Sequence, residues 1–383
     1  MKKLTLKERK KYNKMRRDFD WRQKPDLDSC CNGPFNNMYF TTRGSVSPCW
    51  ILPGEVEYWT DDRSINDIWF GEKYNELRHN LKQGIFKGEK KCDVCYHNIR
   101  NGVWPLAMAY DRFSVNENKY PTLLELELSN ECNLECLMCD GNLSSGIRKN
   151  RDKLPKLPMH YNDNFVEQLK EYIPHLEELR FNGGEPFLHK IVYKICMLVS
   201  EINPKLQINF ATNGLIYNKR VKEILEKCDI RMNISIDGFT KETYEKIRVN
   251  SDWETLMKNF KIFWKYLLKK NCAPSVMVNP MRNNWWEMKD AVRFANKYKS
   301  NLWYNTVHHP SHLALHNLSI EELKDIHRQL KKDLRKLEEE NKNYNSSNTS
   351  EDYLDKRKAN IGKFQMFVNN QIVGWIADHE KVL

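Results

Sequence analysis

The sequence predicts an α/β protein built around a partial (β/α)6 barrel, with a small α+β domain before the barrel and a helical extension after it. Three observations predict this class. Short apolar segments alternate with amphipathic helical patterns from about residue 120 to residue 310. Residues 30–115 lack that alternation and carry turn signals such as CNGPF and TTRGSVSP. A long charged helical pattern follows residue 316.

These changes of pattern divide the 383 residues into four regions. The regions are a basic N-terminal arm (1–29), the α+β domain (30–115), the barrel (116–312), and a C-terminal helix, polar linker and terminal segment (313–383). The charged pattern after residue 316 predicts a solvated helix, and the sequence NYNSSNTSED predicts the linker.

Six apolar segments are the predicted barrel strands. They are LLELELS (123–129), LEELRFN (176–182), LQINFATN (206–213), IRMNISID (230–237), PSVMVNP (274–280) and NLWYNTV (301–307). Helical patterns follow them, such as NDNFVEQLKEYI and NWWEMKDAVRFANKY. Because each strand is followed by a helix, the strands are expected to run parallel, and six units make an open barrel instead of a complete eightfold one.

The charge is concentrated at the N-terminus. Residues 1–17 contain nine lysines and arginines and a single acid, Glu8, so this segment carries +8 of the net +11 and leaves only +3 for the rest. The run predicts a solvated tail, or alternatively a contact for an acidic partner. This distribution argues against nucleic-acid binding by the fold itself. No segment approaches eighteen apolar residues and the N-terminus has no apolar signal region, so a cytoplasmic protein with no membrane contact is expected.

Three of the eleven cysteines form a C-x3-C-x2-C pattern, Cys132, Cys136 and Cys139, directly after the first predicted strand. Active sites of barrel folds lie at that end of the strands. Three clustered thiolates suit a 4Fe-4S cluster that keeps one iron open for a substrate or cofactor. The alternative is a zinc site completed by a nearby histidine or by Asp140.

From about residue 120 to residue 310 the chain resembles the radical S-adenosylmethionine (radical SAM) enzymes, whose TIM-like partial barrel carries this cysteine pattern after its first strand. The strings FNGGEP, ATNG and ISIDG at the ends of the following strands extend the resemblance. It implies that S-adenosylmethionine is bound by Gly183, Gly184, Glu185, Asn213, Ser235 and Arg248. Glu185 and the backbone beside it would receive the amino group, Asn213 the ribose, and Ser235 with Arg248 the carboxylate. Met138 departs from the family, since an aromatic residue often precedes the last cysteine.

The α+β domain carries a second cysteine pattern, in which Cys31, Gly44 and Cys49 are followed by Cys92 and Cys95. This pattern resembles the twitch and SPASM domains, and the resemblance implies an auxiliary 4Fe-4S cluster ligated by the four cysteines. Cys30 leaves the first ligand ambiguous, and the domain precedes the barrel instead of following it. A structural zinc site is the alternative.

The two resemblances together imply an enzyme that cleaves S-adenosylmethionine reductively and uses the 5'-deoxyadenosyl radical to abstract hydrogen from a substrate. The implied cofactors are the radical SAM 4Fe-4S cluster, the auxiliary 4Fe-4S cluster and S-adenosylmethionine, with an electron donor such as flavodoxin or ferredoxin. A peptide or protein substrate is expected. The alternatives are a small molecule such as a sugar or nucleotide, or a non-catalytic iron-sulfur protein.

Two weaker groups of residues remain. Four histidines follow the last predicted strand, His308, His309, His312 and His316. Their spacing permits a metal site, but Pro310 interrupts a helix there, so substrate contacts or packing are favoured. Glu125 and Glu127 alternate with leucines on the first strand and point either into the barrel or to solvent.

Overall fold

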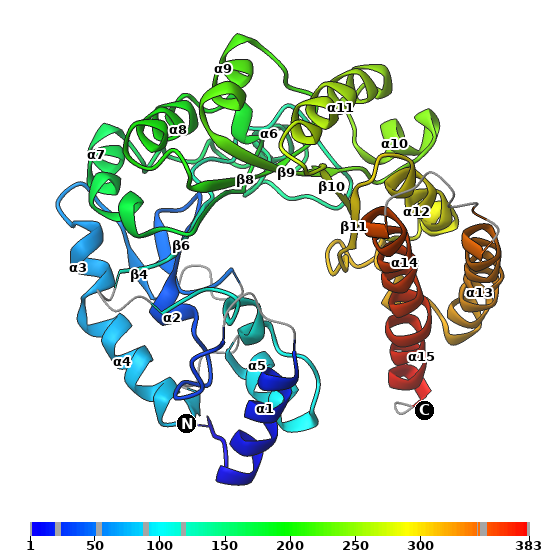
Figure 1. Cartoon of the computed structure of the whole chain (residues 1–383), viewed down its shortest axis with the longest axis horizontal. Helices are drawn as coiled ribbons and strands as arrows, with labels where there is room; N and C mark the ends of the chain where they lie inside the picture. Colours follow the sequence, from blue (N-terminus) through cyan, green and yellow to red (C-terminus); the bar gives the residue numbers. More distant parts are fainter. Residues whose placement is uncertain are drawn as a thin grey trace. The chain divides into compact units, whose positions relative to one another are not determined.

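The computed structural model describes residues 2–19, 24–50, 56–86, 92–115, 120–342, 344 and 351–380 (Figure 1). Its contacts separate two compact units. Unit 1 comprises Met1–Asn130, Lys156–Phe210 and Lys222–Ile230, and unit 2 comprises Glu131–Pro155, Ala211–Val221 and Arg231–Leu383. No helix in the described part of the chain is long and apolar enough to cross a membrane.

Unit 1 contains a mixed sheet in which the first predicted barrel strands are extended by strands of the N-terminal domain. The order is β4 (Glu57–Tyr58), β3 (Ser45–Ser47), β2 (Asn37–Phe40), β6 (Leu123–Leu126), β7 (Glu178–Phe181) and β8 (Gln207–Thr212). β2, β6, β7 and β8 are parallel, while β3 pairs antiparallel with β2 and β4. The α+β domain therefore shares a sheet with the strands that follow it.

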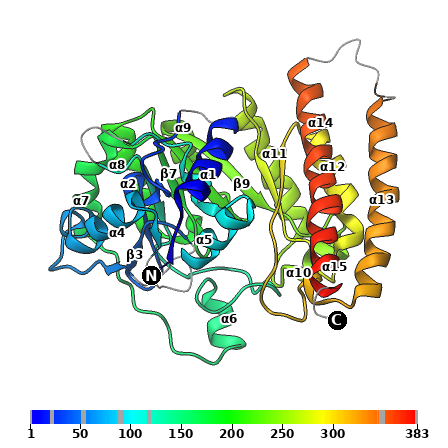
Figure 2. The ribbon, with the colours of Figure 1, turned by 90° about the horizontal axis from the view of Figure 1, so that it is seen from below.

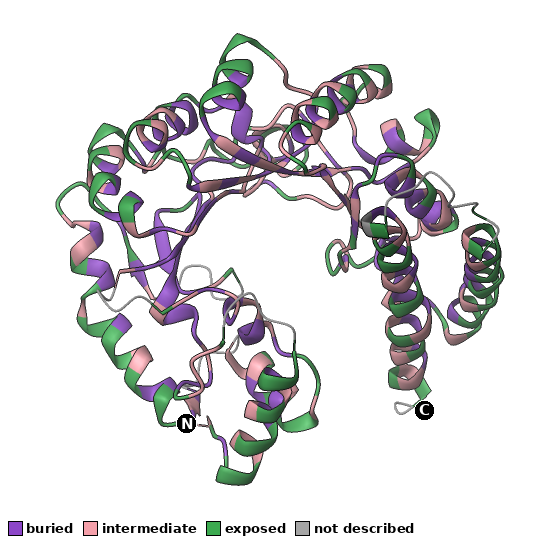
Figure 3. Cartoon of the chain, in the orientation of Figure 1, coloured by how far each residue is buried: buried purple, intermediate pink, exposed green. Residues whose placement is uncertain are grey.

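Helices α7 (Asp163–Tyr172) and α8 (Lys190–Ile202) cover one face of this sheet (Figure 1). The side chains on that face are apolar and buried, and Phe40 of β2 meets Phe165 of α7 at a ring distance of 5.1 Å. Along β8, half-buried residues alternate with buried ones, so the half-buried residues lie on the other face; Figure 3 colours the chain by burial. Polar residues occupy this second face, which is the face of Glu125 on β6 and Arg180 on β7.

The rest of unit 1 consists of short elements around the N-terminal cysteines. They are β1 (Lys2–Lys3), α1 (Leu6–Asp18), α2 (Gly33–Asn36), α3 (Ile65–Trp69), α4 (Glu72–Lys82), β5 (Ile85–Phe86), α5 (Cys92–Asn101) and the 3-10 turn η1 (Leu106–Tyr110). The solvated tail predicted from the charge run is wrong for residues 6–18. A capping box between Thr5 and Glu8 starts α1, and Tyr12 and Arg16 are buried, so burial of one face orders the basic segment.

Unit 2 contains the remaining parallel strands, in the order β9 (Asp229–Ser235), β10 (Ser275–Val278) and β11 (Asn301–Tyr304), and β9 begins at the boundary with unit 1. Its helices are α6 (Ser145–Asn150), α10 (Lys241–Ile247), α11 (Trp253–Leu268) and α12 (Met288–Lys297), while α9 (Lys219–Lys227) crosses the same boundary. The predicted α/β class is confirmed, because a strand lies at each of the six predicted positions and the strands within each unit's barrel portion run parallel.

The chain ends in a helical region, as predicted. It consists of α13 (Ile320–Lys342), α14 (Glu351–Met366), the π-helix η6 (Phe367–Ile372) and α15 (Val373–Glu380). Figures 1 and 2 show α13 and α14 side by side. Leu323, Leu330 and Leu337 of α13 are buried, so this helix is not solvated all round as its charge predicts. Most of the predicted linker lies outside the described residues.

Candidate functional site

The loop that follows β6 carries Cys132, Cys136 and Cys139 and belongs to unit 2. Its backbone is fixed by the segment after α10, because the amides of Glu135 and Leu137 donate to the carbonyls of Val249 and Ile247, both at 3.0 Å. The Leu134 amide donates to Cys132 Sγ at 3.5 Å, an orientation that favours a thiolate there.

Arg248 lies at the centre of this arrangement and is 6% exposed. Its NH2 group forms an ion pair with Asp237 Oδ2 at 2.6 Å, and its NH1 group donates to Cys136 Sγ at 3.8 Å. Its Nε is buried with no hydrogen-bond partner among the described residues. A buried donor beside three thiols fits an anionic group that would be bound at this position.

Of the three thiols, Cys136 is buried, and Cys132 and Cys139 are half-buried. Burial raises the pKa of Cys136, and the facing Arg248 guanidinium lowers it in part. Burial also raises the pKa of Cys139 to about 12, helped by the neighbouring cysteines and Asp140. Both groups are therefore protonated at neutral pH, and binding of iron would displace their protons.

Two further predicted residues of unit 2 lie at strand ends. Asn213 donates through Nδ2 to Asn133 Oδ1 at 2.9 Å, which joins the end of β8 to the residue after Cys132. Ser235 is the last residue of β9, opposite Met277 of β10. The structure thus brings Asn213 and Arg248 to the cysteine loop, and it places Ser235 at the carboxyl end of the adjoining strand.

Gly183, Gly184 and Glu185 follow β7 and belong to unit 1. Gly183 has φ +81°, and a Cβ at this position would lie 2.4 Å from Cγ of Glu127, so both backbone and space require glycine. Glu185 has no exposed surface, caps the turn η3 (Pro186–Leu188), and accepts the Phe187 amide at 3.2 Å.

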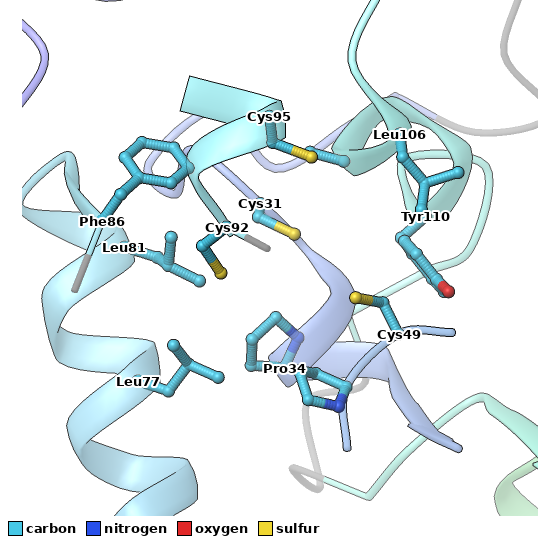
Figure 4. A pocket seen from close by; sticks show the side chains of 12 residues that line it. Cys31, Pro34, Cys49, Leu77, Leu81, Phe86, Cys92, Cys95, Leu106 and Tyr110 are labelled. Atoms are coloured by element: carbon cyan, nitrogen blue, oxygen red, sulfur yellow. The ribbon is translucent and has the colours of Figure 1, made fainter. Parts of the chain in front are cut away.

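The four N-terminal candidate ligands line one cavity in unit 1. Figure 4 shows Cys31, Cys49, Cys92 and Cys95 around this cavity. The remaining wall is almost entirely apolar and comprises Pro34, Pro48, Leu77, Leu81, Phe86, Leu106, Ala107 and Tyr110. Burial raises the pKa values of Cys31 and Cys95. Four thiols in an apolar cavity form a donor set that fits an iron-sulfur cluster.

The structure also separates Cys31 from its neighbour. Cys30 does not line the cavity; it is 2% exposed and lies near Gly84 and Arg9. Its burial raises the pKa of its thiol. Of the two residues between which the sequence could not choose, Cys31 is therefore the one positioned with the other three.

A polar cluster that the sequence did not identify adjoins this cavity. The Tyr110 hydroxyl, from the cavity wall, donates to Glu125 Oε2 at 3.1 Å, and Asn37 Nδ2 donates to the same oxygen at 2.8 Å. Arg180 forms an ion pair with Glu125 Oε1 at 2.9 Å. Burial raises the pKa of Glu125 to about 7, although the hydrogen bonds from Asn37 and Tyr110 oppose the rise. Of the two orientations left open, Glu125 takes the inward one and is buried.

The histidine segment forms a cluster of its own in unit 2. The rings of His308 and His316 are 5.2 Å apart, and His379 Nε2 lies 2.8 Å from the His316 carbonyl oxygen. Within the described residues, no three His, Cys, Asp or Glu side chains converge closely enough to hold a single metal ion.

Two family models match the chain. Residues 126–295 match the radical SAM superfamily, and residues 30–96 match SPASM, an iron-sulfur cluster-binding domain. The SPASM match therefore precedes the radical SAM match, as the cysteine patterns predict. These domains imply 4Fe-4S clusters, and the three-cysteine loop and the four-cysteine cavity lie within their respective matches.

Relatives match only part of the chain. Molybdenum cofactor biosynthesis protein moc-5 of Caenorhabditis elegans is 26% identical over 180 residues, which cover 46% of this chain and 28% of the relative. GTP 3',8-cyclase of Clostridium botulinum is 23% identical over 175 residues, which cover 46% of this chain and 53% of the relative. The matched segment thus spans about half or less of these proteins.

Among solved structures, SuiB of Streptococcus suis bound to precursor peptide SuiA is similar, with a TM-score of 0.40 and 15% identity. The similarity covers 69% of this chain and 57% of SuiB.

Proposed function

We propose that this chain, a radical SAM enzyme with a SPASM domain ahead of its core, modifies a side chain of a peptide or protein with the help of two 4Fe-4S clusters. The core cluster would be held by Cys132, Cys136 and Cys139, and the auxiliary cluster by the four cysteines of the unit 1 cavity. An electron donor such as flavodoxin or ferredoxin would supply the reducing electron.

The core residues divide into those that hold the cluster and those that bind the cofactor. A cluster bound there would supply the one-electron chemistry for which S-adenosylmethionine would be held beside it. Arg248 would use its unpaired Nε for the carboxylate of the cofactor, together with Ser235. Asn213 would contact the ribose. Gly183, Gly184 and Glu185 would receive the amino group, because this turn combines a buried carboxylate with a backbone that only glycine adopts at Gly183.

The contact between Tyr110 and Glu125 is the observation that carries the proposed role of the auxiliary site. Tyr110 is part of the wall of the four-cysteine cavity, and Glu125 lies on the polar face of β6. An auxiliary cluster in that cavity would therefore be one side chain away from the polar face of β6, the strand that leads to the three-cysteine loop. This placement supports a role in turnover, such as accepting an electron from the substrate.

The charges of that face favour a peptide over a polyphosphate nucleotide. Glu125, Glu127 and Glu178 lie there with Arg112 and Arg180. Both arginines already form ion pairs, Arg112 with Glu178, and Arg180 with Glu125 and Glu178. A triphosphate is recognised by uncommitted cations and bidentate arginines. A neutral, amide-rich ligand matches the hydrogen-bonding groups of this face better.

Iron content and cofactor cleavage test the two cluster assignments. The anaerobically reconstituted chain should bind about eight irons and should cleave S-adenosylmethionine slowly to 5'-deoxyadenosine when reduced. Replacing Cys132, Cys136 and Cys139 together by alanine should leave about four irons and abolish the cleavage. The matched control replaces three other buried or half-buried thiols, Cys196, Cys228 and Cys272. It should change neither quantity. Stoichiometric zinc without acid-labile sulfide in the wild-type protein would contradict the proposal.

Isotope transfer tests the substrate class. The reduced enzyme is incubated with S-adenosylmethionine and either deuterium-labelled GTP or a deuterium-labelled peptide fraction. The peptide fraction includes any short peptide encoded beside the gene. The peptide fraction should accelerate formation of 5'-deoxyadenosine and pass deuterium into it, while GTP should do neither. Deuterium transfer from labelled GTP would instead assign the chain a nucleotide substrate.

A further inference from the structure

The outer surface of α1 carries a stripe of four cations. Lys7, Lys10, Lys14 and Arg17 are spaced three, four and three residues apart, so they lie on one side of the helix. All four are exposed, and the exposed residues of α1 are green in the cartoon of Figure 3. We refer to these four residues as the cationic stripe.

The opposite side of α1 packs next to the auxiliary site. Tyr12 belongs to a buried cluster with Leu81, Phe86 and Met108, against which Cys31, Cys92 and Cys95 pack. Leu81 and Phe86 are also walls of the four-cysteine cavity. The stripe is therefore separated by the thickness of one helix, about 10 Å, from the apolar cluster against which the cysteines pack.

Other charges of the N-terminal segment already have partners inside unit 1. Lys2 pairs with Asp93 at 2.7 Å, Glu8 with Arg100 at 2.8 Å, and Arg16 with Asp111 at 2.6 Å. Within the described residues, no ion pair involves a member of the cationic stripe. The segment thus uses three of its charges to attach α1, while the four cations of the stripe point outward.

We propose that the cationic stripe docks an acidic one-electron carrier protein, which exchanges electrons with the auxiliary cluster. The inference rests on the proposed function, because it requires a cluster in the four-cysteine cavity. In the exchange one electron passes between the carrier and the cluster: when the cluster has been reduced by substrate oxidation, it is reoxidised and the carrier is reduced. The stripe attracts the acidic surface of the carrier and orients it over the helix that covers the cluster.

Position and charge together favour this partner. A row of cations alone would suit several acidic surfaces, but this row lies on the helix whose buried side shares an apolar cluster with Cys31, Cys92 and Cys95. Outside residues 1–17 the chain has a net charge of only +3, so attraction of an acidic protein would be concentrated on this helix. Complementary charge accelerates association by about 10-fold to 1,000-fold at low salt.

The test compares two variants of equal charge change. The stripe variant is Lys7→Gln, Lys10→Gln, Lys14→Gln and Arg17→Gln, and the control variant is Lys331→Gln, Lys332→Gln, Arg335→Gln and Lys336→Gln on the exposed side of α13. Glutamine keeps the helix propensity of lysine and arginine. Both proteins are reconstituted and their iron is counted. Their clusters are then reduced with dithionite, the excess is removed, and cluster oxidation by an oxidised flavodoxin is followed by absorbance. Binding of the flavodoxin is measured separately by titration.

The stripe variant should keep about eight irons but exchange electrons with flavodoxin at least about tenfold more slowly at low salt. The control variant should behave like wild type. At about 1 M salt, where the Debye length is about 3 Å, wild type and stripe variant should become equal. A small oxidant such as ferricyanide should react with both at similar rates, which shows that the cluster itself is intact.

Several results would overturn the proposal. One is an unchanged flavodoxin rate and affinity in the stripe variant, and another is an equal loss in the control variant. Weaker binding of DNA or of a polyglutamate peptide with unchanged flavodoxin exchange would assign the stripe to a different partner. If the stripe variant does not fold, a salt-independent rate for wild type alone overturns the docking model. If wild type binds only about four irons, the proposed auxiliary cluster has failed, and docking fails with it.

Discussion

Arg16 forms a fully buried ion pair with Asp111 in unit 1. Its replacement tests how the N-terminal domain is held together. Its Nε and NH2 groups donate to the two Asp111 carboxylate oxygens at 2.7 and 2.6 Å, and both side chains have no exposed surface. It also donates to the carbonyls of Ser29 and Asp26, each at 2.7 Å. These bonds attach α1 to the segment that leads into Cys31.

We expect Arg16→Met to lower the free energy of unfolding of unit 1 by about 3–5 kcal/mol, because removal of one partner leaves a buried, unpaired carboxylate. Among the described residues, Asp111 accepts one other side-chain hydrogen bond, from Asn32 at 2.9 Å, and burial already raises its pKa despite Arg16. The measurement is denaturant unfolding followed by tryptophan fluorescence, with iron content recorded for the same samples. Loss of the attachment before Cys31 should also lower retention of iron at the auxiliary site.

Two variants make the result interpretable. Arg17→Met changes the adjacent, exposed arginine and should alter stability by no more than about 0.5 kcal/mol. Arg16→Met combined with Asp111→Leu should recover most of the loss, since an apolar pair can replace a buried ion pair. If Arg16→Met unfolds within about 0.5 kcal/mol of wild type, the buried ion pair does not hold α1 in place and the reasoning is wrong.

Three further outcomes are expected. Cys31→Ser should remove about four irons per chain whereas Cys30→Ser should remove none, and equal losses in an iron assay would reverse the assignment. The free energy of unfolding of the wild type should fall by up to roughly 3 kcal/mol as the pH rises from 4.5 to about 7, because Glu125 loses its proton at a lower pH in the unfolded chain than in the folded one. Glu125→Gln should flatten this part of the plot of unfolding free energy against pH. An unchanged slope in the variant would show that Glu125 does not hold the proton. Gly183→Ala should destabilise by about 1–3 kcal/mol and weaken binding of S-adenosylmethionine, because the positive φ and the close approach to Glu127 both exclude a Cβ; equal affinity in a calorimetric titration would contradict this placement.

The strands and the cysteine loop could be predicted because their signals are local. A strand appears as a short apolar segment, and the helix after it repeats its apolar residues every three to four positions. Both patterns are present in the sequence whatever the elements pack against. Cys132, Cys136 and Cys139 lie within eight residues, so their proximity follows from the sequence itself. The α/β class, the order of the two cysteine domains and the helical C-terminal region were therefore accessible from the sequence.

The contacts around each cysteine set were not accessible, because they join residues that are far apart in the chain. Arg248 meets Cys136 across 112 positions. Asn37 meets Glu125 across 88 positions, and although Glu125 alternates with leucines along its strand, no local pattern marks Asn37 as its partner. The sequence could not decide between Cys30 and Cys31 for a related reason. The two are adjacent, so their distances to Cys49 along the chain differ by a single residue. Only the packing of Cys30 near Gly84, and of Cys31 at the cavity, separates them.

The basic N-terminus shows most clearly what a charge count omits. A run of nine cations has the composition of a solvated tail. The net charge of the segment is the same whether its cations surround a coil or lie on one side of a helix. The difference comes from Tyr12 and Arg16, which are buried and anchor α1 although their neighbours are charged. Arg16 is neutralised by Asp111, whereas Lys7, Lys10 and Arg17 remain exposed. Burial of one side of α1 therefore fixes the positions of the positive charges on its other side. A segment whose sequence resembles a tail thereby becomes a surface with a defined position beside the auxiliary cysteines.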